Sequence, residues 1–412
     1  MNLETAQTPA TPFARSVAMN TKAFRIHRAL AVLLMGGLAL CCAGAHDLPD
    51  SVQTQQAREK WVKAKGHKVY YTKKFDLADL PDYSPGQKVS GTLRMWGSNY
   101  FTDSPLAEYW EKDFRKYQPD VKFDFHLKTS EHAVSALIFG VSDIGPLGRQ
   151  IMWDEQLAFQ RQFGYLPLGI VAVTGSYDVS GWNPPIGVYL NNKNPLTRVS
   201  LRQLDGIFGA ERSGAWRDLN WDTALARGPE RNVRTWGQLG LTGEWADKPI
   251  HVYGYNLQFH FPQEIESRAF GGVSGKWNEQ LREYDNVRLP DGSLKLAGQL
   301  MLEDLAKDPY GIAYVAGGNA WLSPEIKAVA LGVQDGGPYY DLTLDNVRNR
   351  TYPLYADVFF FINRDPDKPV DPKVREFIRY VLSRQGQQQV MRDGKYLPLT
   401  AEAVREQLKK LE

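Results

Sequence analysis

The sequence predicts an α/β fold in which helices cover both faces of a sheet. From Gly91 onward, short apolar strands alternate with amphipathic helices. The helix at 106–117 (LAEYWEKDFRKY) carries Trp110 and Phe114 on one face, and the strand at 121–128 (VKFDFHLK) has an apolar residue at every second position. Helical and strand periodicities that alternate in this way are typical of a sheet packed between two helix layers.

The remaining elements follow from the same two patterns. Strands are predicted where short runs of branched and aromatic residues lie between turn residues: 91–96, 141–146, 166–175, 185–192, 248–256 and 357–363. Helices are predicted at 131–140, 154–163 and 374–394. The sequence shows no internal repeat or low-complexity tract, so alternating strands and helices account for most of the chain.

Length and composition indicate a globular protein. The 412 residues are enough for two sizeable lobes, and 43% hydrophobic with 23% charged residues argues against disorder. The chain carries 49 Lys and Arg against 47 Asp and Glu, and the segment before residue 46 holds four of these bases and one of these acids. The rest is close to neutral, which argues against a nucleic-acid surface or a polybasic membrane surface.

A signal peptide is predicted at residues 1–45. Basic residues from Lys22 to Arg28 precede an apolar run at 29–40, and a small-residue cleavage signature ends at Ala45. The apolar run is too short for a comfortable bilayer span. Cleavage after Ala45 would place the mature protein in the periplasm or outside the cell.

Both cysteines of the chain, Cys41 and Cys42, lie inside this predicted signal peptide. The mature chain would then contain no disulfide and no thiolate site. Lipid anchoring at Cys41 is the alternative, but Leu40 is an unfavourable residue immediately before a lipidated cysteine. We therefore expect cleavage rather than anchoring.

A corner of Gly97, Ser98 and Asn99 follows the first strand, within RMWGSNYFTDSPL at 94–106. A helix start is predicted just after it. Unpaired backbone N–H groups and a helix dipole make such a corner a candidate site for an anion or a polar ligand. The alternative is a tight turn that only returns the chain to its sheet.

Three parts of the chain carry motifs in a fixed order. The segment 194–219 contains a short predicted helix, an Ile-Phe-Gly turn and Trp-Arg-Asp-Leu, and the segment 308–318 is DPYGIAYVAGG. The blocks 352–365 and 374–399 contain Tyr-Pro-Leu, a predicted strand, a predicted helix and a closing Gly-Lys-Tyr-Leu-Pro-Leu. In their order and spacing over residues 90–400, these segments resemble the phosphate-type periplasmic solute-binding proteins of ABC transporters.

The resemblance implies a type II periplasmic binding protein fold, with two α/β lobes joined by two crossing strands and a ligand cleft between them. It predicts these parts: signal peptide 1–45, N-terminal extension 46–87, lobe one 88–193 plus 350–412, and lobe two 194–349. The implied function is capture of a small anionic or polar ligand by hinge closure, for an ABC uptake system with a membrane permease. The resemblance implies no cofactor, and we expect a monomer.

The resemblance also implies ligand contacts in three loops of lobe one. They are the Gly-Ser-Asn corner, two hydroxyls in KTSEHA at a helix start, and an arginine after the DIG strand. These residues are Gly97, Ser98, Asn99, Thr129, Ser130 and Arg149. A turn, a helix cap and a solvated arginine are the alternative interpretations of the same positions.

The fourth ligand loop departs from the family pattern. Phosphate binders place an arginine and Ser-Gly-Thr at the head of a lobe-two helix, because a buried oxyanion needs a bidentate cation and several donors. The stretch 251–270 has neither before its helix, and offers aromatic faces and neutral donors instead. These residues are Tyr253, Tyr255, Asn256, Gln258 and His260. The departure argues against phosphate itself, and the alternative is that this loop packs a core.

An enzyme is not predicted, and we assign no catalytic or metal-binding residue; a periplasmic hydrolase is the least favoured of the alternatives. The chain has no His-Glu-x-x-His, no Gly-x-Ser-x-Gly elbow and no Asp-rich metal loop. Four histidines are scattered along the chain without metal-ligand spacing: His126, His132, His251 and His260. The adjacent acids Asp154 and Glu155 are interpreted as first-turn carboxylates that interact with a helix dipole.

A third class of function is an extracytoplasmic sensor or scaffold that keeps the binding fold and signals its closed state to a partner protein. The N-terminal extension and a Trp-rich insertion at 216–245 are compatible with that role, because exposed Trp and Arg are common interface anchors. They are equally compatible with decoration of lobe two.

Overall fold

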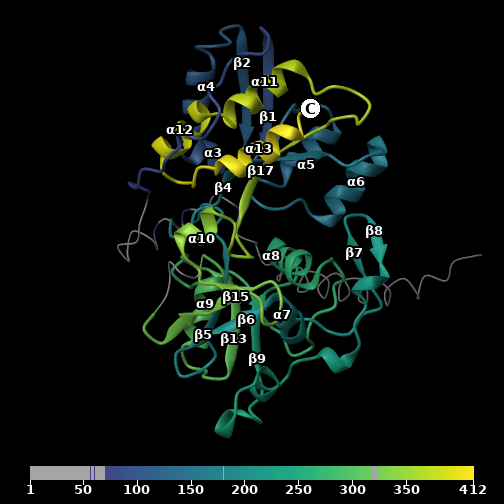
Figure 1. Cartoon of the computed structure of the whole chain (residues 1–412), viewed down its shortest axis with the longest axis vertical. Coiled ribbons are helices and arrows are strands. Elements are labelled where there is room, and N and C mark those ends of the chain that lie inside the picture. Colours follow the sequence, from purple (N-terminus) through teal and green to yellow (C-terminus); the bar gives the residue numbers. More distant parts are fainter. Residues whose placement is uncertain (1–55, 57–59, 61–69, 180, 318–322) are drawn as a thin grey trace, which may run out of the picture. The chain divides into compact units, whose positions relative to one another are not determined.

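A parallel strand pair and a three-stranded antiparallel sheet form the centre of lobe one. In the computed structural model, which describes residues 56, 60, 70–179, 181–317 and 323–412, β1 (Gly91–Gly97) pairs with β2 (Val121–Leu127) (Figure 1). Strand β17 (Asp357–Ile362) lies between β3 (Gly145–Leu147) and β4 (Leu168–Thr174). The predicted signal peptide and the alternative anchor at Cys41 lie outside the described residues.

Helices from both ends of the described chain pack on these strands. They are α3 (Tyr100–Asp103), α4 (Leu106–Phe114), α5 (His132–Ile138), α6 (Trp153–Phe163), α11 (Pro372–Val381), α12 (Arg384–Asp393) and α13 (Ala401–Lys409). The late helices α11 and α12, yellow in Figure 1, contact the early helix α4. Trp110 of α4 is buried and donates its Nε1–H to the Gly386 carbonyl at 2.9 Å. The lobe is therefore closed by contacts between residues far apart in sequence.

A five-stranded mixed sheet forms the centre of lobe two. Its order is β10 (Arg282–Tyr284), β9 (His251–Tyr255), β13 (Gly311–Ala316), β5 (Ile186–Asn191) and β14 (Ile326–Ala328). A smaller sheet has the order β16 (Tyr339–Tyr340), β15 (Ala330–Gly332) and β6 (Arg198–Ser200). The α-helices described in this part are α7 (Leu201–Phe208), α8 (His260–Ile265), α9 (Ala297–Leu305) and α10 (Leu344–Arg348).

Short elements decorate lobe two. The hairpins pair β7 (Ala215–Arg217) with β8 (Asn220–Asp222), and β11 (Val287–Arg288) with β12 (Leu294–Lys295). Single-turn 3-10 helices lie at Thr223–Leu225, Pro229–Arg231, Trp236–Leu239 and Gly243–Trp245, and a π-turn extends α8 over Glu266–Phe270. Most of the predicted Trp-rich insertion is therefore short turns, anchored by the buried Trp236.

Two connections join the lobes side by side. One follows β4 and leads to β5, and the other leads from α10 to β17. Gly175 donates its N–H to the Ala356 carbonyl at 2.9 Å, and Ile186 donates to the Leu354 carbonyl at 3.0 Å. The Tyr352 hydroxyl donates to the Ile186 carbonyl at 3.1 Å. The two segments are therefore bonded to each other where they cross.

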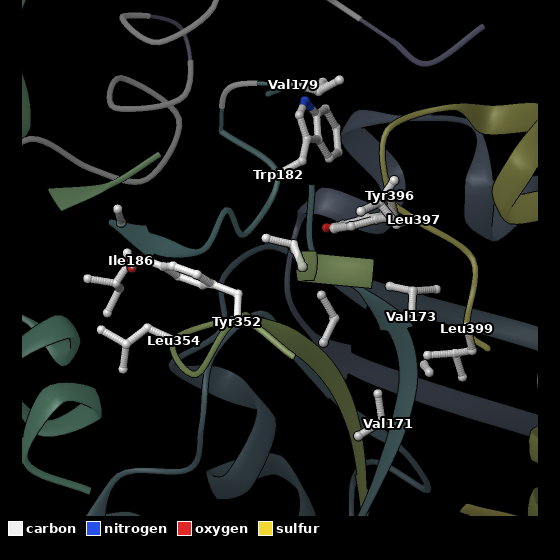
Figure 2. Close-up of a cluster of buried hydrophobic side chains, with 14 of the residues drawn as sticks. Val171, Val173, Val179, Trp182, Ile186, Tyr352, Leu354, Tyr396, Leu397 and Leu399 are labelled. Carbon is white, nitrogen blue, oxygen red and sulfur yellow. Dashed lines mark hydrogen bonds between the residues drawn. The ribbon is translucent and has the colours of Figure 1, made fainter. Parts of the chain in front are cut away.

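Buried apolar side chains surround this crossing (Figure 2). The cluster draws on β4, on both connections and on the segment after α12. Figure 2 labels Val171, Val173, Val179, Trp182, Ile186, Tyr352, Leu354, Tyr396, Leu397 and Leu399. All of these side chains are buried, so the hinge is packed as densely as a core rather than exposed as a loop.

Two sequence-based boundaries differ from the structure. The predicted single helix 374–394 is wrong, because the chain forms α11 and α12 with a break at Ser383, whose Oγ caps the second helix by accepting from the Gly386 N–H. The boundary predicted at residue 193 places β5 in lobe one, but β5 pairs with β13 and β14. We therefore propose that the lobe boundary lies in the connection that precedes β5.

The described end of the N-terminal extension packs on the hinge. The Tyr71 hydroxyl accepts hydrogen bonds from the N–H groups of Tyr177 at 2.6 Å and Asp178 at 3.2 Å, in the first connection. Lys73 forms an ion pair with Asp345 of α10 at 3.1 Å. The extension thus contacts both the hinge and a helix next to it.

Replacing Tyr71 with phenylalanine should lower the free energy of unfolding by about 1–3 kcal/mol, because two backbone donors lose the hydroxyl that accepts from them. Urea unfolding followed by circular dichroism measures this difference. The matched control is Tyr70→Phe, since Tyr70 is 58% exposed. Equal stability of the two variants would show that the Tyr71 contacts do not hold the extension in place.

Candidate functional site

Three loops of lobe one converge at the end of β1. An added Cβ on Gly97 would lie 2.2 Å from the Pro146 carbonyl oxygen, which also accepts the Ser98 N–H at 2.9 Å. The Gly148 N–H donates to Ser130 Oγ at 3.4 Å, and an added Cβ on Gly148 would lie 3.5 Å from Ser98 Oγ. Glycine at position 97 is what allows its loop to approach Pro146 so closely, whereas a Cβ at position 148 would make only an ordinary van der Waals contact.

Ser98 is the polar centre of this convergence. Its side chain is fully buried, and its Oγ has no hydrogen-bond partner among the described residues. A buried hydroxyl without a partner costs free energy, so such groups are rare in folded proteins. A ligand oxygen or nitrogen at this position would supply the missing bond.

The neighbouring predicted residues shape the same loops. The Asn99 side-chain amide donates to the Asp103 carboxylate in α3, and the Asn99 backbone carbonyl accepts the Thr102 N–H at 2.9 Å. The Thr129 carbonyl accepts the His132 N–H at 3.3 Å at the start of α5. Both residues therefore fix the starts of short helices beside Ser98 and Ser130.

Arg149 lies at the edge of this group and is buried. Its guanidinium donates to both carboxylate oxygens of Glu155 at 2.8 Å, and also to the Gln150 carbonyl at 3.0 Å. Burial alone would lower the pKa of Arg149, but the hydrogen bonds to Glu155 and the charge of Glu131 help to raise it. The arginine therefore stays charged and is neutralised by the chain's own carboxylate.

A seam of polar contacts joins the loop after Arg149 to α8 of lobe two. The Trp153 N–H donates to Gln263 Oε1 at 3.0 Å, and the Gln263 amide approaches the Ile151 carbonyl at 3.5 Å. With its amide oriented to accept, Gln150 receives two hydrogen bonds from Arg268 at 3.0 and 3.1 Å. The two lobes are thus in direct contact at the side of the cleft.

Two acids are buried behind this seam. Glu264 lies 3.8 Å from Arg268, and Asp357 lies 2.7 Å from Arg350. Burial raises the pKa of Glu264 although the charges of Arg268 and Arg149 oppose the shift. Burial likewise raises the pKa of Asp357 although Arg350 and Arg268 oppose the shift. Each of these two buried acids therefore lies next to an arginine.

A pocket of about 310 Å³ opens along the same seam. The rings of Trp153 in lobe one and Trp216 in lobe two lie 5.3 Å apart in its wall. The polar part of the lining consists of amide and hydroxyl residues and two charged residues: Gln150, Gln156, Gln263, Ser267, Arg217 and Asp218. None of the sequence-predicted site residues lines this pocket, which lies beside the converging loops.

The predicted residues of lobe two divide into two sets. The Tyr253 hydroxyl donates to Asp308 Oδ2 at 2.7 Å, and the Tyr255 hydroxyl accepts the Ala316 N–H at 3.1 Å. Both tyrosines are buried, and the Tyr255 ring stacks on Phe261 at 4.4 Å. These two side chains are used within lobe two, as the core-packing alternative describes.

The second set lies in the loop before α8. The Asn256 amide donates to Asp285 at 3.0 Å, and its Oδ1 accepts the Gln258 N–H at 2.9 Å. Gln258 is exposed, and the His260 ring lies 4.0 Å from the Phe261 ring. This loop is therefore a polar surface next to the helix that forms the seam.

Sequence reasoning missed the residues that pair across the seam. Within lobe one, the pair of Glu155 with Arg149 was also missed, because the sequence indicates only that Glu155 is a first-turn acid of α6. Glu155 also accepts the Met152 N–H at 2.8 Å. Gln263 and Arg268 lie far along the chain from their lobe-one partners. Only the position of Glu155 three residues into the helix gave a local signal, because that spacing is typical of a capping box.

Two further searches cover only the described part of the chain. Within it, no group of three or more His, Cys, Asp or Glu is arranged to hold a metal ion. Within the same residues, no helix is both long enough and apolar enough to cross a membrane.

Several known proteins that are similar to this chain are described as phosphate-binding proteins or as PstS. The phosphate-binding protein PstS of Pseudomonas aeruginosa (strain PAO1) is 28% identical over 332 residues, covering 81% of this chain and 90% of the relative. The structure of PstS from Borrelia burgdorferi has a TM-score of 0.44 at 15% identity, covering 76% of this chain and 100% of that one. A putative phosphate ABC transporter substrate-binding protein with bound phosphate, from Clostridium perfringens, has a TM-score of 0.39 at 17% identity, with coverage of 75% and 100%.

A family model described as the PBP superfamily domain matches residues 84–385. The match contains the strands and loops of lobe one up to β17, the whole of lobe two and both connections. It covers well over half of the 412 residues. The chain therefore belongs to the PBP superfamily, the periplasmic binding proteins.

Proposed function

We propose that this chain is an exported solute-binding protein that captures a small polar or anionic ligand between its lobes. Membership of the PBP superfamily, a family of solute-binding proteins rather than enzymes, supports this proposal. The name of the relative from P. aeruginosa, a phosphate-binding protein, supports a phosphate-type uptake system with a membrane permease as the destination of the ligand.

One observation carries the proposal more than any other. The Ser98 hydroxyl is buried without a partner among the described residues, where the loops of Gly97, Ser130 and Gly148 meet. We expect an oxygen or nitrogen of a ligand bound between the lobes to complete the hydrogen bonding of this hydroxyl. The contacts of the seam and the bonded connections support capture by closure about a hinge.

We propose that the ligand lies against Gly97, Ser98, Asn99, Thr129 and Ser130, with the loop before α8 opposite. Trp153 and Trp216 face each other across the seam, so their fluorescence should report closure. The experiment is a fluorescence and calorimetric titration with phosphate, sulfate, molybdate and a panel of phosphorylated, carboxylated and neutral metabolites. Saturable binding of one class supports the proposal, and no binding by any class would favour a sensor or scaffold.

Replacing Ser98 with alanine should weaken binding of the ligand found in that titration by roughly tenfold. This factor corresponds to the loss of one hydrogen bond worth about 1.4 kcal/mol. The same change should not lower the melting temperature, because the hydroxyl has no partner in the unliganded chain among the described residues. Ser135→Ala is the matched control, since Ser135 is exposed on α5. Equal affinity in both variants would remove Ser98 from the site.

A further inference from the structure

Arg268 of lobe two makes its hydrogen bonds to other parts of the chain. With the Gln150 amide oriented to accept, Arg268 Nε and Nη2 donate to the Gln150 side-chain oxygen in lobe one at 3.0 and 3.1 Å. Arg268 Nη1 donates to the Pro353 carbonyl at 3.4 Å and to the Tyr355 carbonyl, both in the connection from α10 to β17. All three guanidinium nitrogens are therefore used, and each of these acceptors lies outside the lobe that carries the arginine.

The local fold holds Arg268 in this position. Arg268 lies within the π-turn Glu266–Phe270, and π-turns are rare and frequently found at functional sites. The Glu266 carboxylate accepts the Gly275 N–H at 2.6 Å, which ties the turn to the loop that follows it. The Arg268 side chain is only 14% exposed, and its Cζ lies 4.7 Å from the centre of the Tyr355 ring. The guanidinium therefore loses little further freedom when it forms its hydrogen bonds.

Arg268 also supplies positive charge next to two buried acids. Its Nε lies 3.8 Å from Glu264, and its charge opposes the raised pKa of Asp357. A lysine would supply the same charge, but it lacks the planar fork that reaches Gln150 and two backbone carbonyls at once. Replacing Arg268 with lysine therefore separates charge compensation from hydrogen bonding between the lobes.

We propose that Arg268 is a closure latch, a positioning residue that holds lobe one and the connection from α10 to β17 against lobe two in the closed state. This inference rests on the proposed function, because it concerns closure of the same two lobes. The bonds from Arg268 to Gln150 exist only while the lobes touch. They therefore stabilise the closed state and contribute nothing to an open one.

The test is hydrogen exchange of the Trp153 N–H in purified protein without ligand. Trp153 is the first residue of α6, so its N–H has no partner in its own helix and donates to Gln263 Oε1 at 3.0 Å across the seam. Its exchange therefore requires the seam to open. The Val329 N–H donates to the Val188 carbonyl at 3.0 Å within lobe two and reports opening of the fold itself.

The variants are Arg268→Lys, Gln150→Ala and the two combined. Arg231→Gln is the matched control, because Arg231 is exposed on a single-turn 3-10 helix of lobe two. In each single variant, the Trp153 N–H should exchange at least about tenfold faster, as expected for the loss of one hydrogen bond to a charged group. The Val329 N–H should keep its wild-type rate. The combined variant should exchange no faster than Arg268→Lys, because both changes remove the same bonds.

Two results would overturn the inference. One is a wild-type exchange rate of the Trp153 N–H in either folded single variant. The other is equal acceleration of the Trp153 and Val329 N–H groups, because Arg268 would then only stabilise the fold. If Arg268→Lys does not fold, Gln150→Ala decides alone, since it leaves the charge beside the buried acids in place.

The exchange measurement uses no ligand, so it is independent of the titration that tests the proposed function. If wild type binds a ligand of the panel and Ser98→Ala weakens that binding, but Trp153 exchange is the same in all variants, only the latch inference fails. If the variants accelerate exchange while no ligand of the panel binds, the latch inference stands and capture of a panel ligand fails.

Discussion

Replacing Arg149 with alanine is expected to lower the free energy of unfolding by about 3–5 kcal/mol, because it leaves the carboxylate of Glu155 largely buried without its counter-ion. The pair is bidentate, so both oxygens of Glu155 lose a charge-assisted donor at once. Urea unfolding at neutral pH measures the loss. The variant should also lose contacts at the seam, because Arg149 holds the backbone carbonyl of Gln150, the residue whose side-chain amide oxygen accepts from Arg268.

Arg161→Ala is the matched control, since Arg161 is exposed on the same helix, α6, as Glu155. A double variant with methionine at both Arg149 and Glu155 should recover most of the lost stability, because an apolar pair of similar size removes both charges together. The account would be contradicted if Arg149→Ala cost no more than Arg161→Ala. It would also be contradicted if the double variant were less stable than the single one.

Replacing Gly175 with alanine is expected to destabilise the hinge by at least about 3 kcal/mol through overpacking. An added Cβ would lie 1.8 Å from the Asn183 carbonyl oxygen and 3.2 Å from the Ala356 carbonyl oxygen. Neither neighbour can yield easily, because Gly175 donates to Ala356 and the Asn183 amide donates to the Asp357 carbonyl at 2.7 Å. Thermal unfolding and the ligand titration should both detect the change.

The control for this variant is Gly164→Ala. Gly164 has a positive φ of 84° and no atom within 4 Å of an added Cβ, so alanine there meets only backbone strain of about 1–2 kcal/mol. Similar losses for the two variants would mean that the connections can separate freely at Gly175. A much larger loss of stability at Gly175 would show that the two crossing segments are packed tightly against each other, as their hydrogen bonds indicate.

The elements that sequence periodicity predicts best are those whose pattern is local. The strand Gly91–Gly97 and the helix that begins at Leu106 appear where their alternation and amphipathic face predict them. The Gly-Ser-Asn corner also has a local sequence signal, but the Pro146 carbonyl and Gly148, which Gly97 and Ser98 adjoin, come from a loop much later in the chain. Whether these loops hold a ligand stays a prediction.

Other features depend on contacts that no local pattern contains. The break between α11 and α12 at Ser383 coincides with the bond from Trp110 to Gly386, which comes from a helix much earlier in the chain. Strand β5 joins lobe two because its partners, β13 and β14, come over a hundred residues later. The pairing of Glu155 with Arg149 requires the fold of the loop between them, so the sequence showed only a helix-start acid.

The central claim is that two hinged lobes close over a ligand held at Ser98. The most direct test is a distance measurement by pulsed electron resonance between spin labels at Lys112 and Glu244, which are exposed on lobe one and lobe two. Both native cysteines precede residue 46, so protein expressed as residues 46–412 takes label only at the introduced sites. The account predicts that a saturating ligand shortens and narrows the distance distribution in the labelled protein, and that about tenfold more ligand is needed for the same change when Ser98→Ala is added. An unchanged distribution in the first protein, at ligand saturation confirmed by calorimetry, would contradict it.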